Sequence, residues 1–478
     1  MPRVVTAFND RSGRLLPSGK LDFEANSANT SVTYRKGAGL IGWATSADGK
    51  TWAYHGKLQP PTGWAVLIAD PAAAVDPQNK ATVYVGMLAQ SNSSWNTSFG
   101  ASTTEISTPL RPSATGFCVA RSTDAGLTFP AVQCVEAGTE VDLSALTVDG
   151  TGRVWFATVD KLNVGTKIWR STSAAAWGSF QLVIPTCDDV GDPDCSNPSL
   201  PQNFVAGDEP RLVTDLFGEV WLSTVRTGTI PARLEVVSWD NATDFTNGYF
   251  RLSDECGLLN LLTAGSINAV IGSGAAVIRN AFRYSLAFGL TNVLRNHALR
   301  VAYEFELPGL GRHIQVAELS SEIPAQTCAQ IPGWSTTGAP TALVSNNFMT
   351  ALNYQNRGSG AGGVNNPEWW LAYATDVASE SRTDKYLNYR AAALNLLPTP
   401  VVFPQVQMAP SNYYTCPGGA GYWGDYIGLT QFNPTPGLTT GWQNVSTFSD
   451  SRPAPPCGPA GILARPVQVA SFRWSASQ

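Results

Sequence analysis

Two stretches decide the fold: Ser46-Ala-Asp48-Gly49-Lys-Thr51-Trp52 and Ser122-Thr-Asp124-Ala-Gly126-Leu-Thr128-Phe129. Both place a serine two residues before an aspartate, then a glycine, then a threonine followed by an aromatic residue. The Ser and Asp side chains of such a pattern accept hydrogen bonds from nearby backbone N–H groups, and the glycine supplies a positive φ. The aromatic ring then returns to a hydrophobic core. Each stretch therefore predicts a tight turn between two β-strands.

The composition favours an all-β protein. Only 14% of the 478 residues are charged, whereas the chain contains 44 Gly, 32 Pro and 15 Trp. Few charges together with many turn and aromatic residues are typical of many short strands. The net charge is −5 and there is no basic run, so we expect no nucleic-acid partner. No apolar run reaches the roughly 18 residues of a membrane span, so we expect none.

A repeated unit organises the chain. In each copy an acidic residue begins a strand of small apolar residues, and a strand of the type Val-Trp-Phe-Ala-Thr follows. The sharpest copies begin at Asp70, Asp142 and Glu209. Alternating apolar and polar residues in these strands predict small four-stranded sheets stacked around a channel. We therefore expect an all-β fold, with residues 1–478 forming a single β-propeller domain closed by its N- and C-terminal strands.

Seven blades fit this repeat, or six if one weak unit is an insertion. The expected blades span residues 3–60, 64–136, 140–186, 206–254, 264–320, 340–396 and 421–474.

The eight cysteines indicate a disulfide-bonded protein. Cys118 and Cys134 flank the second turn stretch, and a bridge there would close a loop of about 15 residues and stabilise the fold by roughly 3 kcal/mol. The other expected pairs are Cys187–Cys195, Cys256–Cys328 and Cys416–Cys457. Eight buried free thiols are the alternative. Disulfides favour a secreted or cell-surface protein, and the first residues show no signal-peptide core.

The two turn stretches, the repeat and the segment Trp423-Gly424-Asp425-Tyr426-Ile-Gly428-Leu429 resemble bacterial sialidase-like propeller proteins with Asp-box (BNR) repeats. The resemblance covers essentially the whole chain at the level of the repeat, and it implies a propeller that acts on or binds glycans. Sialidases of this kind clamp the substrate carboxylate with three arginines, because a guanidinium pairs bidentately with a carboxylate. Tyr34-Arg35-Lys36 lacks the Ile-Pro of the first arginine motif, so no complete arginine triad is assigned.

The candidate site is the channel mouth, where the innermost strand of each blade begins. Converging carboxylates with an arginine and a tyrosine could perform acid/base chemistry or hold a sugar. The candidate catalytic residues are Asp70, Glu209, Arg211, Asp425 and Tyr426, and the further ligand-binding candidates are Asp142, Asp208, Asn268, Asn347 and Trp423. Two alternatives remain open: the ring holds a hard cation such as calcium, or its members only cap strand ends.

An acidic loop offers a second candidate for calcium. Asp188, Asp192 and Asp194 supply carboxylates within seven residues, but the loop lacks EF-hand spacing. A solvated loop tied by Cys187 and Cys195 is the other interpretation. No cofactor is required by any motif.

Together these features predict a secreted sialidase-like β-propeller that engages a glycan or glycoconjugate at its channel mouth, as a divergent glycoside hydrolase. The alternative is a non-catalytic propeller used for adhesion, partner binding or as a scaffold. The sequence does not indicate an oligomeric state.

Overall fold

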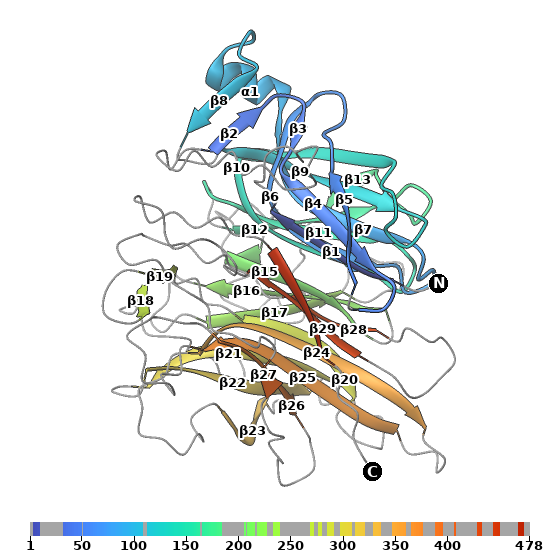
Figure 1. Cartoon of the computed structure of the whole chain (residues 1–478), viewed down its shortest axis with the longest axis vertical. Coiled ribbons are helices and arrows are strands. Elements are labelled where there is room, and N and C mark those ends of the chain that lie inside the picture. Colours follow the sequence, from blue (N-terminus) through green and yellow to red (C-terminus); the bar gives the residue numbers. More distant parts are fainter. Residues whose placement is uncertain are drawn as a thin grey trace, which may run out of the picture. The chain divides into compact units, whose positions relative to one another are not determined.

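The structure is a computed structural model, and almost all of its regular elements are β-strands, as the composition predicts (Figure 1). The described residues are 3–9, 32–49, 51–108, 112–162, 165–183, 205–206, 208–215, 218–226, 233–239, 268–271, 276–279, 284–290, 297–307, 311–320, 328–335, 347–359, 365–375, 388–394, 406–407, 428–432, 443–449 and 467–472. The chain divides into two compact units, Met1–Arg226 with Glu235–Arg251 and Thr227–Leu234 with Leu252–Gln478.

The first sheet of the first unit has the strand order β1-β4-β5. Its strands are β1 (Val4–Asn9), β4 (Ile41–Ser46) and β5 (Ala53–Lys57). The pairing of Val4 with Ser46 matches the pairing of Val83 with Ser122 in the next sheet. Therefore β1 takes the place in its sheet that β7 takes in the next one.

A nine-stranded sheet follows. It consists of two successive antiparallel meanders, with one short strand paired in parallel at its edge and another paired off its main path. Its strands are β3 (Ala38–Gly39), β6 (Trp64–Val75), β7 (Val83–Ser91), β9 (Ala114–Ser122), β10 (Ala131–Val148), β11 (Val154–Asp160), β12 (Gly165–Ser171), β13 (Phe180–Val183) and β14 (Val205–Ala206). The long strand β10 joins the two meanders: residues 131–136 pair with β9, and residues 141–148 pair with β11.

A third sheet comprises β15 (Asp208–Thr214), β16 (Val220–Arg226) and β17 (Arg233–Trp239). The first strands of successive meanders pack against one another, β6 on β10 and β10 on β15. This arrangement, in which each meander begins beside the previous one, is the one expected of propeller blades. The number of blades and the closure of a ring stay predictions.

The first unit also contains a small module that the sequence did not predict. It is built from α1 (Asn92–Phe99), β2 (Val32–Arg35) and β8 (Glu105–Thr108), which lie together in Figure 1. Ser91 caps the helix by accepting a hydrogen bond from the Ser94 N–H at 3.3 Å. The fully buried Trp95 donates from Nε1 to the Thr103 carbonyl at 2.8 Å. Tertiary burial of this ring explains why a short helix forms in a polar segment.

The second unit continues the pattern of antiparallel sheets, with orders β18-β19, β20-β21-β22-β23, β24-β25-β26-β27 and β28-β29-β30. The strands are β18 (Asn268–Ile271), β19 (Ala276–Arg279), β20 (Tyr284–Leu290), β21 (His297–Leu307), β22 (Gly311–Ser320), β23 (Cys328–Ser335), β24 (Asn347–Ser359), β25 (Asn365–Thr375), β26 (Asn388–Leu394), β27 (Val406–Gln407), β28 (Gly428–Phe432), β29 (Gln443–Ser449) and β30 (Val467–Phe472). The sheet β20-β21-β22-β23 spans residues 284–335, and the blade boundaries stay predictions.

Apolar side chains fill the space between neighbouring meanders of the first unit. Phe117 of β9 stacks on Phe156 of β11 with ring centroids 4.1 Å apart, and both residues are fully buried. These two strands belong to adjacent meanders, so the contact packs one meander on the next. Such face-to-face burial explains why the strands read as nearly continuous apolar runs.

The second turn stretch forms the predicted turn between β9 and β10. Ser122 Oγ donates to Asp124 Oδ1 at 2.7 Å and accepts from the Gly126 N–H at 2.8 Å. Asp124 in turn accepts from the Thr128 N–H at 3.0 Å and from the Thr128 hydroxyl at 2.7 Å. The glycine has φ +82°, the left-handed backbone that the pattern required.

The first turn stretch closes the β4–β5 hairpin in the same way. Asp48 accepts a hydrogen bond from Ser46 Oγ at 3.0 Å, from the Thr51 N–H at 2.7 Å and from Thr51 Oγ1 at 3.0 Å. Gly49 has φ +70°. Within the turn, side-chain oxygens therefore accept hydrogen bonds from backbone N–H groups, as backbone carbonyls do between paired strands.

The second turn also packs on the first sheet. Trp43 Nε1 donates to the Gly126 carbonyl at 3.1 Å, and the Phe129 ring meets the Trp43 ring edge-on at 5.5 Å. A Cβ at Gly126 would lie 2.5 Å from Val5 Cγ2, so the position also requires a residue without a side chain. The aromatic residue returns to a core, as the sequence predicts.

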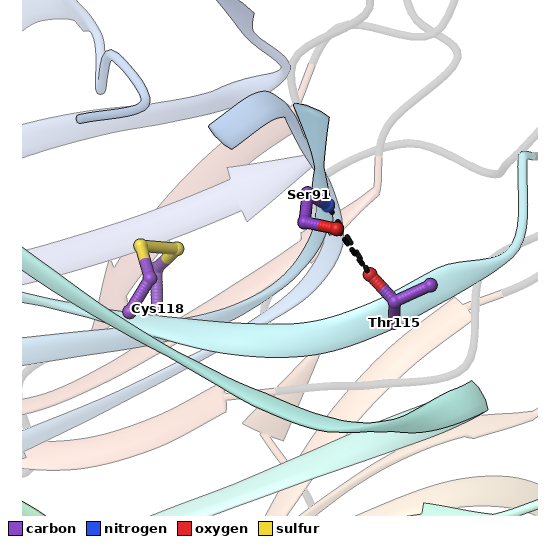
Figure 2. The surroundings of a disulfide bond; sticks show 4 residues. Ser91, Thr115 and Cys118 are labelled. Atoms are coloured by element: carbon purple, nitrogen blue, oxygen red, sulfur yellow. Dashed lines mark hydrogen bonds between the residues drawn. A yellow bond between two sulfur atoms is a disulfide. The ribbon is translucent and has the colours of Figure 1, made fainter. Parts of the chain in front are cut away.

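The predicted bridge between Cys118 and Cys134 is confirmed. The two residues lie directly opposite each other on β9 and β10, so no backbone movement is needed to join them. Figure 2 shows the bridge beside Ser91 and Thr115, where the Ser91 N–H donates to Thr115 Oγ1 at 3.2 Å. Cys187, Cys195, Cys256, Cys416 and Cys457 lie outside the described residues and the side chain of Cys328 is not described, so the other three pairs stay predictions.

Removing the bridge should lower stability. We expect the paired change Cys118→Ala with Cys134→Ala to reduce the free energy of unfolding by about 3 kcal/mol, because the unfolded chain regains the freedom of the closed loop. Urea unfolding of variant and parent under non-reducing conditions measures the difference. The difference should shrink when both are unfolded with a reductant. Equal midpoints without reductant would contradict the expectation.

Acid should weaken the second turn. Burial alone would raise the pKa of the Asp124 carboxyl, but hydrogen bonds from Ser122 and Thr128 outweigh it and lower the pKa below its usual value. The stabilisation by this carboxylate is therefore complete above the unfolded pKa and is lost as the pH falls through the folded pKa. We expect Asp124→Asn to be less stable than the parent near neutral pH, and the gap to close towards about pH 2. Urea unfolding across that range tests this, and a constant gap would refute it.

Candidate functional site

Four strands, β6, β10, β15 and β24, share one irregularity, a β-bulge of one extra residue. In β6, Ala69 pairs with Leu88 and the next regular pair joins Ala72 to Gly86, so three steps on β6 oppose two on β7. The same three-against-two spacing occurs in β15 after Asp208 and in β24 after Phe348, whereas β10 has a two-against-one step between Asp142 and Ser144. Bulges re-aim side chains and recur beside functional sites.

Three residues at the first three bulges have left-handed backbone although none is glycine. Asp70 has φ 55°, Leu143 has φ 56° and Glu209 has φ 55°. They occupy the same register position in successive meanders, one residue after the last regular pair. Such conformations are unfavourable for residues with a Cβ and persist where surrounding contacts enforce them.

The bulges correct the sequence alignment by one residue. The repeat aligns Asp142 with Asp70, but the residue that shares the left-handed backbone and register position of Asp70 is Leu143. A sequence repeat cannot reveal this shift, because the acidic residue is placed before the bulge in one strand and inside it in another. Asp142 remains in the same bulge, at its first position.

Asp70 is buried, with 8% of its surface exposed. Its N–H donates to Asn9 Oδ1 of β1 at 3.0 Å, and its carbonyl accepts a hydrogen bond from Ser144 Oγ of β10. The backbone of one candidate residue is therefore bonded to side chains of both neighbouring meanders.

The second bulge is held by groups of its own sheet. Asp142 Oδ1 accepts from the Leu143 N–H at 3.0 Å. Thr158 Oγ1, across the strand pair on β11, lies 3.0 Å from the Asp142 carbonyl and 2.9 Å from the Leu143 carbonyl. The Asp142 carboxylate also pairs with Lys161 Nζ at 3.4 Å, at the turn after β11. This ion pair brings a cation to the edge of the bulge.

The third bulge carries an acidic residue and an arginine. Glu209 is 7% exposed, and its Oε2 lies 3.5 Å from Arg211 Nη2. Arg211 Nη1 also donates to the Pro210 carbonyl at 2.9 Å. The Arg211 guanidinium thus contacts residues of its own bulge.

We call Asp70, Asp142, Glu209 and Arg211 the bulge cluster. These residues come from strands that pack side by side, and the Ser144–Asp70 hydrogen bond joins two of the bulges directly. Sequence analysis named all four. It missed Asn9, Ser144, Thr158 and Lys161, although the recurrence of Ala-Thr-Val at 157–159 and Ser-Thr-Val at 223–225 marks the position of Thr158.

The remaining candidates are placed as follows. Asp208 is the last paired residue before the third bulge, and Asn347 is the first residue of β24, at the strand start expected for it. Asn268 instead begins the two-stranded β18–β19 sheet, whereas β20 is the strand that packs on β24. The copy of the repeat near Asn268 is a weak one, and its sequence did not distinguish a two-stranded hairpin from a first strand. Trp423, Asp425, Tyr426, Asp188, Asp192 and Asp194 lie outside the described residues.

No three His, Cys, Asp or Glu side chains gather around a common point in the part of the chain that the structure describes. Within the same residues, no helix is long and apolar enough to cross a membrane.

A second set of buried aspartates closes the opposite ends of the first strands. Asp149 Oδ1 accepts from the N–H groups of Thr151 and Arg153, and its Oδ2 accepts from Trp155 Nε1 at 2.9 Å. Asp215 repeats this arrangement with Trp221 Nε1 at 3.3 Å. All their oxygens serve the turn, so these aspartates have a structural role.

The left-handed backbone of residue 70 should be measurable. We expect Asp70→Gly to be more stable than Asp70→Ala by about 1 kcal/mol, because both lose the same carboxylate but only glycine adopts this φ without strain. Urea unfolding of the two variants gives the difference. Ala72, in the paired part of the same strand, is the control: Ala72→Gly should be less stable than the parent. Equal stability of the two variants at position 70 would contradict the left-handed assignment.

No protein-family model matches the sequence, and no curated protein matches it. Among solved structures, the chain is similar to a Hadza microbial sialidase, with 10% identity, 86% of this chain and 71% of that chain covered, and a TM-score of 0.41. It is similar to a polysaccharide lyase, with 10% identity, 93% and 98% covered, and a TM-score of 0.39. It is also similar to an Aleuria aurantia lectin mutant in complex with Fucalpha1-6GlcNAc, with 8% identity, 87% and 95% covered, and a TM-score of 0.36. These identities of 8–10% assign the chain to no family.

Proposed function

We propose that this chain is a secreted β-propeller that binds a carbohydrate at the bulge cluster. The observation that carries the proposal is the left-handed backbone of Asp70 and Glu209, two buried acidic residues at the same bulge position of β6 and β15, the strands that pack on either side of β10. A strained backbone that presents buried acidic residues is not needed for strand pairing, and such strain concentrates at ligand sites. The repeated meanders support the propeller part of the proposal.

The cluster offers the groups that a sugar requires. Carboxylate oxygens accept hydrogen bonds from sugar hydroxyls, and charge-assisted bonds of this kind are stronger than neutral ones. Lys161 Nζ and the Arg211 guanidinium supply donors at the edges of the second and third bulges. Acceptors and donors from adjacent strands would thus engage several hydroxyls of one ring.

The charges favour a neutral saccharide over an acidic one. Arg211 already engages Glu209 Oε2 at 3.5 Å and the Pro210 carbonyl at 2.9 Å. A sugar carboxylate would have to displace Glu209 from this guanidinium and would face the nearby carboxylates of the cluster. Because like charges repel at short range, the site suits a hydroxyl-rich ligand without a carboxylate. We therefore propose binding of a neutral glycan rather than sialic acid.

Hydrolysis at the same site is the second candidate. It is favoured by the presence of more than one carboxylate in neighbouring bulges, since glycoside hydrolysis uses a pair of them. Turnover of a glycoside that is lost on changing Asp70 or Glu209 would assign the cluster to catalysis. Binding without turnover would make the protein a lectin.

A glycan array combined with a panel of fluorogenic glycosides tests the proposal. We expect the parent to bind neutral glycans, and we expect Asp70→Asn and Glu209→Gln each to weaken binding about tenfold or more, because each removes a charged acceptor. The control is Glu105→Gln, which removes the carboxylate of an exposed ion pair with Arg35 at 2.7 Å on the β2–β8 module. That variant should bind like the parent.

Two results would refute the proposed function. One is a parent protein that neither binds an arrayed glycan nor cleaves a glycoside. The other is binding that Asp70→Asn and Glu209→Gln leave at the parental level, which would place the glycan site elsewhere.

A further inference from the structure

We infer that Asn9 and Ser144 are positioning residues of the bulge cluster, which hold the left-handed backbone of Asp70 from the two neighbouring meanders and so fix the direction of its side chain. The role of the Asp70 carboxylate in binding rests on the proposed function. The placement of its backbone does not.

The two hydrogen bonds act on the two peptide groups that flank the Asp70 Cα. The N–H belongs to the preceding peptide and donates to Asn9 Oδ1 at 3.0 Å. The carbonyl belongs to the following peptide and accepts from Ser144 Oγ. When both peptide planes are fixed, φ and ψ of residue 70 are fixed, and with them the direction of the Cα–Cβ bond.

Regular strand pairing does not fix φ and ψ of residue 70. The bulge removes Asp70 and Pro71 from the β6–β7 ladder, because the regular pairs resume only at Ala72. Pro71 has no N–H to contribute. The polar backbone groups of Asp70 must therefore find partners outside the ladder, since buried backbone groups are almost always bonded.

The hydrogen bond from Ser144 Oγ to the Asp70 carbonyl is buried, which increases its contribution to stability. Ser144 is 9% exposed and Asp70 is 8% exposed. A buried carbonyl that loses its donor is left desolvated, which is more unfavourable than the loss of an exposed hydrogen bond. Without Ser144 Oγ, residue 70 would be driven towards a backbone conformation that returns its carbonyl to another partner.

At the second bulge, the backbone groups are hydrogen-bonded by side chains of the same strand pair, Asp142 Oδ1 and Thr158 Oγ1. The Asp70 bulge instead depends on β1 and β10, which belong to the meanders on either side of β6. The backbone conformation of Asp70 therefore depends on how β1, β6 and β10 pack together.

The test compares Ser144→Ala and Asn9→Ala with a matched variant, Thr147→Val. Thr147 lies on the same strand as Ser144 and bonds across to Thr214 Oγ1 at 2.7 Å, on the next sheet. All three variants remove one side-chain hydrogen bond to a neighbouring meander, so all should lower the melting temperature. We expect only the first two to weaken glycan binding, by about tenfold, because a binding group tolerates little misplacement. Asn9→Asp keeps the accepting oxygen and should restore binding.

Coupling to Asp70 separates a positioning role from a structural one. In the Asp70→Asn background, Ser144→Ala should cause no further loss of affinity, because residues that act through one another are not additive. A full additional tenfold loss in that background would overturn the inference. So would binding by Ser144→Ala and Asn9→Ala at the level of Thr147→Val.

A ligand-free readout distinguishes failure of this inference from failure of the proposed function. Crystal structures of the parent and of the Ser144→Ala, Asn9→Ala double variant would show φ of residue 70. We expect the positive φ in the parent and its loss in the double variant. A double variant that keeps the left-handed backbone and the carboxylate position would overturn the inference, whether or not the protein binds glycans. Loss of the positive φ with no glycan bound by the parent would leave the inference standing and refute only the proposed function.

Discussion

Backbone hydrogen bonding along β10 is the constraint on which the first unit depends. Its residues 131–136 complete one meander and its residues 141–148 begin the next, so one continuous strand fixes the register of both. The disulfide between Cys118 and Cys134 ties its first half to β9. Its second half carries Ser144 and Leu143, which place the second bulge beside the first.

The candidate site is formed where the bulges of the first strands lie. One extra residue in β6, β10 and β15 interrupts the regular strand pairing, and each interruption carries a left-handed residue, Asp70, Leu143 or Glu209. Side chains from the same or neighbouring sheets hydrogen-bond to backbone groups of the bulges. The strain is tolerated because several contacts enforce it together. It recurs at the same bulge position of three strands that pack in series, β6 on β10 and β10 on β15.

Much of the local structure could be predicted from the sequence, because the responsible interactions join residues a few positions apart. The Ser-x-Asp turn stretches, the strand repeat and the Cys118–Cys134 bridge are of this kind. The acidic candidates Asp70, Asp142 and Glu209 were also found, since each begins a recognisable copy of the repeat. The one-residue shift at Leu143 and the separate hairpin at Asn268 could not be found, because the repeat has no marker for a bulge or for which strand packs innermost.

Spacing and residue type act locally, so the strands, the turns and the acidic residues of the first strands could be predicted from the sequence alone. Which residues meet depends instead on how the strands pack. Asn9 and Ser144 reach Asp70 across 61 and 74 positions of sequence, and no pattern in the chain connects them. Their meeting follows from the packing of β1, β6 and β10, where the backbone groups released by a bulge find partners on neighbouring strands.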